Sequence, residues 1–541
     1  MPNLIELLLV KCSNLEELPS SAAALSTLAK LELTGSQIKS FSVEMFEEMN
    51  NLQSLKLIDN SKLSFAPGLV SKASSLIDVY IEGHESITEV EINLKRHPTL
   101  RSFSLVGTPH IKRLSLHGCR KLESVDIKGA HALEELDLSA TAIKELPESI
   151  PNLPRLRLLL LMGVPSLRRF PWHKLKRLPD VFCLDQCSDG TDNHSNQQVV
   201  QVCICDSRLF YSFNHTTRDL VLRGELLKSF YVQVTSCKAN SRKIQEGEHK
   251  VINNKQLHVS LPTYADVNHC YQTDGVFMVP MDDVPPIREK ERHIVISAVD
   301  RYPHGLGYLL SVTKSIFMSD DSHVSCFSDM RSELYDYELE EFVLQKCHKM
   351  VDVFRYKHVP TMKNASVSDL KNLTHFFGVG FYPEFTALKH LRLEHCPRLE
   401  GIMPCQCALP SLETLDIIFC YNLKAIFYEN GTYYYRNYYN LESLRRIHLQ
   451  ELPLLENLHV DDLILIAPAW EELHVRGCWS LRHLPRLDEQ PGAKAVKVRG
   501  ERAWWTKLRW ASSSHHGSYE PRFPLASASF RERVIIRTYL R

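Results

Sequence analysis

The chain has 541 residues, enough for three or four ordinary domains or for one long array of repeats. Hydrophobic residues make up 44% of the sequence and charged residues 24%, as in ordinary globular proteins, so a wholly disordered chain is excluded. Lysine plus arginine and aspartate plus glutamate number 64 each. This zero balance argues against a dedicated nucleic-acid binder, whose affinity needs an excess of positive charge.

The sequence favours an intracellular protein. Residues 1–19 have neither a basic start nor a small-residue cleavage site, so they do not read as a signal peptide. No apolar run is long enough to cross a membrane. The 15 cysteines are too few for a disulfide scaffold in a chain of this length. We therefore expect a cytoplasmic location, reduced thiols and no stable membrane insertion.

A repeat of the form L-x-x-L-x-L-x-x-C/N/T-x-x-L dominates residues 1–187, which we expect to form regular coils. Its central positions, each 24 residues after the last, are Leu7, Leu31, Leu55, Val79 and Phe103. This spacing and this order of leucines are those of a leucine-rich repeat.

The physics of a short strand explains the pattern. Residues two apart share a face, so both leucines of L-x-L point into the coil and the residue between them faces outward. One coil cannot bury this apolar surface alone, whereas stacked coils can. The sequence thus predicts an α/β leucine-rich-repeat solenoid. We expect a curved horseshoe with a parallel concave β-sheet, and loops, short helices or 3-10 turns on the convex side.

Residues 103–136 contain one match too many. The template fits at Leu114 and at Val125, in steps of 11 residues after Phe103. Because so short a step cannot close a coil, we interpret one of these two matches as spurious, without deciding which.

The repeat weakens between residues 188 and 300. Weak matches occur at Val202, Phe230, Leu257 and Ile294, and strand-like alternation persists. We therefore favour irregular repeats with long loops over a separate domain. Clear leucine-rich repeats resume in residues 301–487, where one step is about eight residues too long because of a Tyr-rich insertion at 427–439.

Residues 488–541 differ in composition from the repeats. Trp504, Trp505 and Trp510 could form an aromatic binding site, but such a block more often covers the open end of a solenoid. The segment also carries more lysine and arginine than aspartate and glutamate. We predict a C-terminal cap followed by a basic tail.

Five segments resemble the C-terminal leucine-rich-repeat region of plant intracellular nucleotide-binding leucine-rich-repeat immune receptors, and grass members most. They are TAIKELPESIPNLPRLRLLLL (141–161), LRLEHCPRLEGIMP (391–404), LPSLETLDIIFCYNLKAIF (409–427), APAWEELHVRGCWSLRHLPRL (467–487) and VRGERAWWTKLRW (498–510). The resemblance covers nearly the whole chain, more weakly in 188–300. It implies recognition of a pathogen effector or a guarded host protein in a plant defence response.

Full-length members of that family carry a nucleotide-binding ATPase module before the repeats, and this sequence departs from them. The sequence has no G-x-x-x-x-G-K-[ST] phosphate loop. It also opens inside a repeat, with no polar residues to cap Leu4, Leu7 and Leu9. We therefore carry over recognition but not signalling, and expect a partner surface at this edge, such as a nucleotide-binding domain in cis or in trans, or else a truncated product.

No catalytic or metal-binding pattern stands out. Seven cysteines, Cys12, Cys119, Cys187, Cys347, Cys396, Cys420 and Cys478, occupy the turn position of the repeat and are interpreted as buried turn residues. The pairs Cys203/Cys205 and Cys405/Cys407 lack the second pair or the spaced histidines of a zinc site. No H-E-x-x-H or G-x-S-x-G motif occurs. We expect no enzyme activity, no cofactor and no metal.

Two sets of residues are the candidate partner contacts. Tyr433, Tyr434 and Tyr435 lie in the insertion, where tyrosines either bind a partner or pack along the convex flank. The second set faces outward when the last four clear repeats are aligned: Arg392, Asp416, Arg446, His448, His474 and Arg476. We expect Arg392 and His474 to point to solvent, and the histidines to make binding sensitive to pH near 6.

These observations predict a protein-recognition module of a plant immune receptor. Two alternatives remain. A leucine-rich-repeat substrate adaptor of a ubiquitin ligase would need a helical box before Leu4, and none precedes it. A truncated, non-functional receptor fragment would explain the uncovered first coil.

Overall fold

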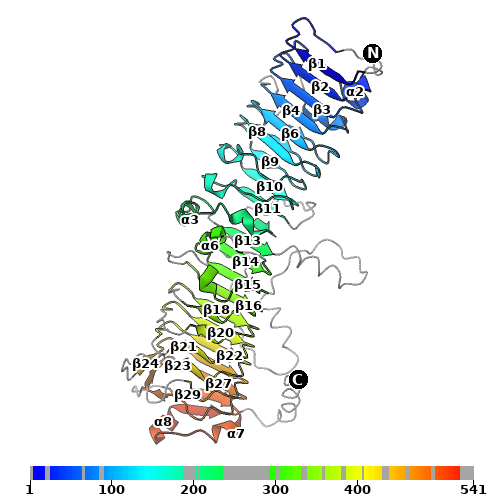
Figure 1. The fold of residues 1–541 in the computed structure, drawn as a ribbon. Coiled ribbons are helices and arrows are strands. Elements are labelled where there is room, and N and C mark those ends of the chain that lie inside the picture. Colours follow the sequence, from blue (N-terminus) through cyan, green and yellow to red (C-terminus); the bar gives the residue numbers. More distant parts are fainter. Residues whose placement is uncertain are drawn as a thin grey trace. The chain divides into compact units, whose positions relative to one another are not determined.

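The computed structural model describes most of the chain. The described residues are 4–18, 25–63, 67–83, 91–186, 201–204, 206–227, 229–235, 292–299, 302, 304–330, 338–355, 360–378, 385–404, 407–428, 438–458, 464–488 and 494–523. The chain divides into two compact units, Met1–Val312 and Thr313–Arg541. Each unit is a stack of coils whose short parallel strands pair with those of the next coil, which confirms the predicted leucine-rich-repeat solenoid (Figure 1).

The first unit begins with a sheet of six strands, which we call the first sheet. Its strands are β1 (Glu6–Val10), β2 (Lys30–Thr34), β3 (Ser54–Ile58), β4 (Asp78–Glu82), β6 (Ser102–Val106) and β8 (Ser124–Lys128). They pair in this order, in parallel and in register, so that the inner leucines stack on one another. Leu31 and Leu33 are fully buried. Helix α2 (Val43–Glu48) and the 3-10 helix η1 (Pro67–Lys72) connect these strands and pack together.

A second sheet starts in the first unit before the first sheet ends. Its opening strands are β5 (Glu91–Asn93), β7 (Arg113–Ser115), β9 (Glu135–Asp137) and β10 (Leu158–Met162), and each pairs in parallel with the next. Leu114 lies in β7 and Val125 in β8, and both are buried. The prediction that one of these matches is spurious was therefore wrong. Each coil here holds two strands, one for each sheet, so both matches are genuine.

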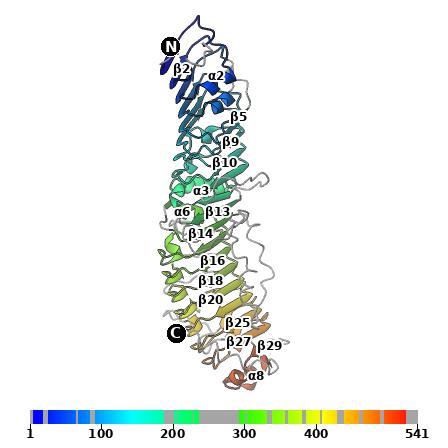
Figure 2. The ribbon, with the colours of Figure 1, turned by 90° about the vertical axis from the view of Figure 1, so that its right-hand side faces the viewer.

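The second sheet then takes over from the first in the rest of this unit. It continues through β11 (Val181–Asp185), β12 (Gln201–Ile204), β13 (Phe230–Thr235) and β14 (Arg292–Ser297). Three of the four weak matches, Val202, Phe230 and Ile294, lie in these strands, whereas Leu257 lies outside the described residues. The coils of this unit are connected by short helices, which are η2 (Ile150–Asn152), η3 (Trp172–Lys174), η4 (Ser207–Phe210), α3 (His215–Leu222) and α6 (His304–Leu310). Helices α3 and α6 lie side by side (Figure 2).

The second unit is built around one long parallel sheet, its main sheet. The strands are β15 (Ser315–Ser319), β16 (Glu341–Gln345), β18 (Asn364–Ser368), β20 (His390–Glu394), β22 (Thr414–Ile418), β25 (Arg446–Gln450), β27 (Glu472–Arg476), β29 (Val496–Gly500) and β30 (Tyr519–Arg522). They pair in this order, so each new coil extends the same sheet.

Other strands of the coils in the second unit form two smaller parallel sheets. One consists of β17 (Asp352–Phe354), β19 (His375–Phe377), β21 (Gly401–Pro404) and β23 (Ala425–Tyr428). The other consists of β24 (Tyr438–Asn440), β26 (Ile464–Ile466) and β28 (Arg486–Leu487). The remaining helices are η6 (Phe327–Met330), α7 (Arg502–Trp505) and α8 (Ser513–Gly517). None of the described helices has the length and the apolar run that a membrane crossing requires.

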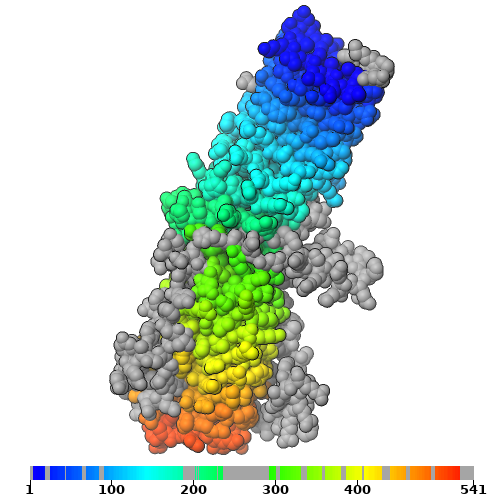
Figure 3. Space-filling view, in the orientation of Figure 1, coloured from blue at the N-terminus to red at the C-terminus, as the bar shows by residue number. Residues whose placement is uncertain are grey.

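Apolar side chains fill the coils of both units, and cysteines occupy the turns. In the space-filling view, atoms of successive coils touch along the first unit (Figure 3). Cys119, Cys347, Cys396, Cys420 and Cys478 are buried, Cys12 is half-buried and Cys187 lies outside the described residues. The Cys347 thiol donates to the carbonyl of Gln345 (3.4 Å), and burial raises its pKa to about 12. The buried turn cysteines of the described coils are therefore packing groups.

The described ends of the chain differ. At the start, Ile5, Leu8 and Val10 are 60%, 49% and 56% exposed. At the other end, residues 494–523 add β29 and β30 to the main sheet, and Trp504 is fully buried. The Trp504 Nε1 donates to the carbonyl of Leu481 (3.1 Å). The last described coil thus carries the aromatic cover expected of a cap, whereas β1 leaves apolar side chains in contact with solvent.

Candidate functional site: two sheet surfaces

The six predicted contact residues lie on four adjacent strands of the main sheet. Arg392, Asp416, His448 and His474 occupy the middle positions of β20, β22, β25 and β27, and strand pairing aligns them in one row. We call these four residues the polar row. Arg446 and Arg476 flank the row at the first and last positions of β25 and β27. The strand pairing confirms the alignment of these residues across the repeats, and their role as partner contacts stays a prediction.

The exposure of the polar row differs from the prediction. The side chains of Arg392 and His474 are only 12% and 13% exposed, and those of Asp416 and His448 only 8% and 9%. The expectation that Arg392 and His474 point to solvent was therefore wrong. Adjacent parallel strands are about 4.8 Å apart, so long side chains at equivalent positions pack against one another and exclude water. Arg446 is more open, with 34% of its side chain exposed, and Arg476 is half-buried.

Ion pairs tie the polar row to its neighbours. Arg392 pairs with Glu394 of the same strand (2.8 Å), and the Glu394 side chain is 11% exposed. On β27, Glu472 accepts a hydrogen bond from His474 (3.1 Å). The same carboxylate lies 3.6 Å from Arg446 and 3.3 Å from Arg499 of β29. Hydrogen bonding to His474 and the charges of Arg499 and Arg446 outweigh its desolvation and lower the pKa of Glu472. Rigid pairs of this kind hold the row in a single arrangement.

Asp416 and His448 at the centre of the row are poorly satisfied. The Asp416 Oδ1 atom is buried and makes no hydrogen bond to any described residue, and the nearest His448 nitrogen is 4.0 Å away. Burial raises the pKa of Asp416, although Arg392 and Arg446 lower it. Burial, with the charges of His474 and the two arginines, lowers the pKa of His448 to about 4. Burial also lowers the pKa of His474, so the expected titration near pH 6 is displaced to more acidic values.

The predicted tyrosine contacts cannot be placed on this surface. Tyr433, Tyr434 and Tyr435 lie outside the described residues. Two nearby tyrosines, Tyr428 and Tyr439, are packed into the coils. Tyr428 is half-buried and donates to the carbonyl of Phe377 (2.8 Å), and Tyr439 is buried and donates to the carbonyl of Cys407 (2.7 Å).

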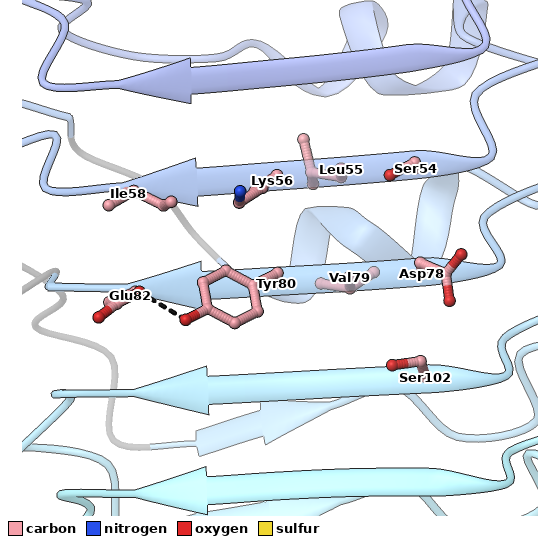
Figure 4. Close-up of a pocket in the computed structure, with 9 residues that line it drawn as sticks. All are labelled: Ser54, Leu55, Lys56, Ile58, Asp78, Val79, Tyr80, Glu82 and Ser102. Carbon is pink, nitrogen blue, oxygen red and sulfur yellow. Dashed lines mark hydrogen bonds between the residues drawn. The ribbon is translucent and has the colours of Figure 1, made fainter. Parts of the chain in front are cut away.

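A second surface, which the sequence did not suggest, is a hollow on the first sheet. It has a volume of about 570 Å³ and spans β3, β4 and β6. Its side-chain walls, shown in Figure 4, are Ser54, Lys56, Ile58, Asp78, Tyr80, Glu82 and Ser102. We call this the first-sheet hollow. Leu55 and Val79 also border it, but their buried side chains belong to the core, so they contribute only backbone.

The hollow arises from unequal side-chain lengths on neighbouring strands. Tyr80 stands beside Ser104 of β6, and Asp78 lies between Ser54 and Ser102, so short serines surround longer residues of β4. The Tyr80 hydroxyl donates to Glu82, and the Lys56 ammonium lies 5.8 Å from the centre of the Tyr80 ring. These contacts hold the ring over one end of the hollow. The alternation of Ser and large residues at equivalent positions is the sequence signal that could have located it.

Neither surface has the groups of a metal centre. Within the described part of the chain, no cluster of three or more His, Cys, Asp or Glu side chains could hold a metal ion. The chemistry that these surfaces offer is hydrogen bonding, ion pairing and aromatic contact. Those interactions serve the binding of another molecule.

Comparison with protein families identifies the repeats that carry the polar row. Residues 381–485 match the family described as plant disease resistance protein RPS2-like, leucine-rich repeats. All of β20, β22, β25 and β27 lie within this range. This part of the chain is therefore similar to the leucine-rich-repeat region of plant disease resistance proteins, a fold that typically serves protein interaction.

Several solved structures are also similar to the chain, at low identity. One is the leucine-rich-repeat ectodomain of the plant membrane receptor kinase GASSHO1/SCHENGEN3 from Arabidopsis thaliana in complex with CASPARIAN STRIP INTEGRITY FACTOR 2, with 14% identity over 96% of this chain and 53% of that chain and a TM-score of 0.19. The chain thus spans about half of that protein's length. Others are the plant peptide hormone receptor RGFR1 in complex with RGF2 (11% identity, 92% and 95% coverage, TM-score 0.15) and YopM from Yersinia enterocolitica WA-314 (12%, 92% and 91%, 0.18). Comparison with curated proteins finds no match.

Proposed function

We propose that this protein is the recognition module of a plant intracellular immune receptor of the nucleotide-binding leucine-rich-repeat type, and that it binds a pathogen effector or a guarded host protein in the cytoplasm. Binding takes place on the main sheet of the second unit, at the polar row and the flanking Arg446 and Arg476. The match of residues 381–485 to plant disease resistance repeats supports the biological setting. The resemblance of the sequence to grass members supports the receptor type.

Two buried polar atoms on this surface lack a hydrogen-bond partner within the described part of the chain, and they are the main support for the proposal. The Asp416 Oδ1 atom and the Arg446 Nε atom are buried, and neither has a hydrogen-bond partner among the described residues. Leaving such groups unpaired costs about 1–3 kcal/mol each. Asp416 Oδ1 lacks a donor, and Arg446 Nε has only the Glu472 carboxylate at 3.6 Å, so a main-chain amide or a carboxamide side chain of a partner that displaces the neighbouring side chains supplies what both groups lack. The surface is therefore incomplete without a polar partner.

The ion pairs of the polar row support the same role. Because Arg392 and His474 are already held by Glu394 and Glu472, the surface loses little conformational entropy when a partner binds. Arg446 and Arg476 are the more exposed cations and provide the contact with an acidic rim. Tyr433, Tyr434 and Tyr435 remain predicted contacts of the same partner. The apolar edge at β1 remains the predicted contact for a nucleotide-binding domain in cis or in trans.

Site-specific crosslinking of the full chain tests this proposal. A benzophenone amino acid at position 476 should crosslink to a protein that is present in extracts of infected plant tissue. Arg398, an exposed residue that follows β20, is the matched control position. The charge reversals Arg446→Glu and Arg476→Glu together should weaken binding of the captured protein at least tenfold at a temperature where melting curves show the variant folded, because Arg446→Glu also breaks the pair with Glu472 and lowers the melting temperature somewhat. Equal adducts at positions 476 and 398, or full binding by the double variant, would exclude this surface.

A further inference from the structure

We propose that the first-sheet hollow is a second binding site, which receives a lysine or arginine side chain from an exposed segment of another protein. The hollow lies on β3, β4 and β6 of the first unit, and the polar row lies on strands of the second unit. The first sheet ends at β8. The two surfaces thus belong to different sheets, and this inference does not depend on the function proposed for the polar row.

Asp78 is the acidic residue of the hollow that remains available. It is exposed, its backbone N–H donates to the carbonyl of Gln53 (3.0 Å), and its carboxylate forms no hydrogen bond or ion pair with a described residue. The carboxylates nearest to it on this face are engaged by Tyr80 at Glu82, by Lys56 at Glu32 (3.4 Å) and by Lys128 at Asp126 (2.8 Å), and Glu6 of the same row lies on β1, outside the hollow. An incoming cation therefore finds one uncommitted carboxylate in the hollow, at Asp78.

The residues around Asp78 suit a cationic head group. Strand pairing places Ser54 on one side of Asp78 and Ser102 on the other, and all three line the hollow. A carboxylate and two hydroxyls can together accept several hydrogen bonds from an ammonium or a guanidinium group. Lys30, the next residue of this row on β2, is the chain's own competing cation, but it forms no ion pair with a described residue.

The other end of the hollow suits the aliphatic part of the same side chain. Ile58 and the Tyr80 ring form an apolar wall, and both are half-buried. Tyr80 is two residues from Asp78, a separation of about 7 Å along a strand, which is close to the length of a lysine or arginine stem. The stem can therefore lie on this wall while the charged group reaches Asp78, which leaves the Lys56 ammonium in place 5.8 Å from the ring centre.

The charge of the lining selects against an acidic ligand. A carboxylate or phosphate placed in the hollow would face Asp78 and Glu82, with Lys56 already engaged by Glu32. A purely apolar side chain would desolvate Asp78 without pairing it. The hollow is an open depression of about 570 Å³, which is enough space for one side chain to lie along its wall. A basic segment is thus the occupant that pairs the free carboxylate and covers the ring.

Fluorescence anisotropy with the full chain tests the site. The probe is a fluorescein-labelled nonapeptide of three Gly-Leu-Arg repeats, compared with the same peptide carrying citrulline, which is uncharged and of equal size. The wild-type chain should bind the arginine peptide saturably and at least threefold more tightly than the citrulline peptide. Asp78→Asn and Tyr80→Leu should each weaken binding of the arginine peptide about threefold, and the double variant roughly tenfold.

The control is Glu6→Gln, which removes one negative charge from β1 in the same row of the sheet, outside the hollow. It should leave the affinity unchanged, and the melting curves of Glu6→Gln and Asp78→Asn should coincide with that of the wild-type chain because both residues are exposed. The half-buried Tyr80 makes a small downward shift expected for Tyr80→Leu and for the double variant, which should still be folded at the assay temperature. Three results would each overturn the proposal: no saturable binding by the wild-type chain, full affinity in the double variant, or a loss in Glu6→Gln equal to that in Asp78→Asn. The last result would show diffuse electrostatic attraction to the sheet.

Discussion

The first-sheet hollow and the polar row occupy equivalent outward-facing positions of the repeat, but they use their side chains differently. In the hollow, short serines flank longer residues, and Asp78 remains exposed and unpaired by any described residue. In the polar row, long side chains lie next to long side chains, and Arg392, His448 and His474 are almost covered. Equal position in the repeat therefore does not imply equal access to solvent.

The difference shows that the side-chain lengths of cross-strand neighbours decide whether an outward-facing position is open to a ligand group or covered by its neighbours. A serine beside a tyrosine leaves space for a ligand group, whereas an arginine beside an aspartate and a histidine closes the surface. The closed surface is rigid and sensitive to the loss of one charge, because little water can replace a missing partner. The open surface tolerates substitution and responds mainly through binding.

Acidification should have the largest effect on the polar row. Unfolded chain takes up a proton at His448 near pH 6.5, and the folded chain only at about pH 4, so the stability that neutral His448 allows is lost as the pH falls through this window. The full difference is about 3 kcal/mol. The pKa of His474 is lowered too, which adds to the loss. The raised pKa of Asp416 acts oppositely, because its protonation relieves a burial penalty at the acidic end.

Hydrogen exchange of the β22–β27 amides between pH 7 and 4, corrected for intrinsic rates, measures this loss. The first unit cannot serve as the control, because burial also lowers the pKa of His97 there. The matched control is the variant His448→Gln, measured in the same strands β22–β27. The variant should lose most of the dependence between pH 6.5 and 5. A variant that keeps the full dependence would show that His448 is not its source.

Removal of one cation from each surface should give the next largest contrast. Arg392→Ala leaves the nearly buried Glu394 without its ion-pair partner and should lower the local free energy of unfolding by about 2–3 kcal/mol. Lys56→Ala breaks a pair whose lysine is 40% exposed and should cost less than about 1 kcal/mol. Native-state hydrogen exchange of the affected strands reports both values. Equal costs would contradict the distinction between a closed and an open surface.

Tyr80→Phe should have the smallest effect. It removes the hydrogen bond to Glu82 but keeps the ring beside Lys56, so the expected cost is about 0.5–1 kcal/mol. Thermal melting followed by circular dichroism measures it, with Tyr80→Leu as the variant that also removes the aromatic face. A cost as large as that expected for Arg392→Ala would mean that the hydroxyl is part of a packed core and that the hollow is not open.

Because L-x-L alternation is a local property, the spacing of the repeat predicted the strands of the first sheet and those of the main sheet from β16 to β27, but not β15 or β30. It did not predict the smaller sheets of the second unit, although Val353, Phe376, Ile402 and Ile426 each follow an inner residue of the main sheet by the step that separates Leu114 from Val125. That step also produced the wrong interpretation of the two matches in the first unit. Spacing alone cannot tell two strands of one coil from a false match, because both are apolar and correctly spaced.

The sequence by itself determined the solenoid, the alignment of Arg392, Asp416, His448 and His474 in one row, and the burial of five of the seven turn cysteines. These follow from periodicity, since residues at equivalent repeat positions must stack. Only the tertiary structure decided that the row is nearly closed to water, that one sheet replaces another across residues 91–137, and that a hollow opens beside Tyr80. Those features depend on how side chains from different coils fill a shared surface, which a repeat pattern does not encode.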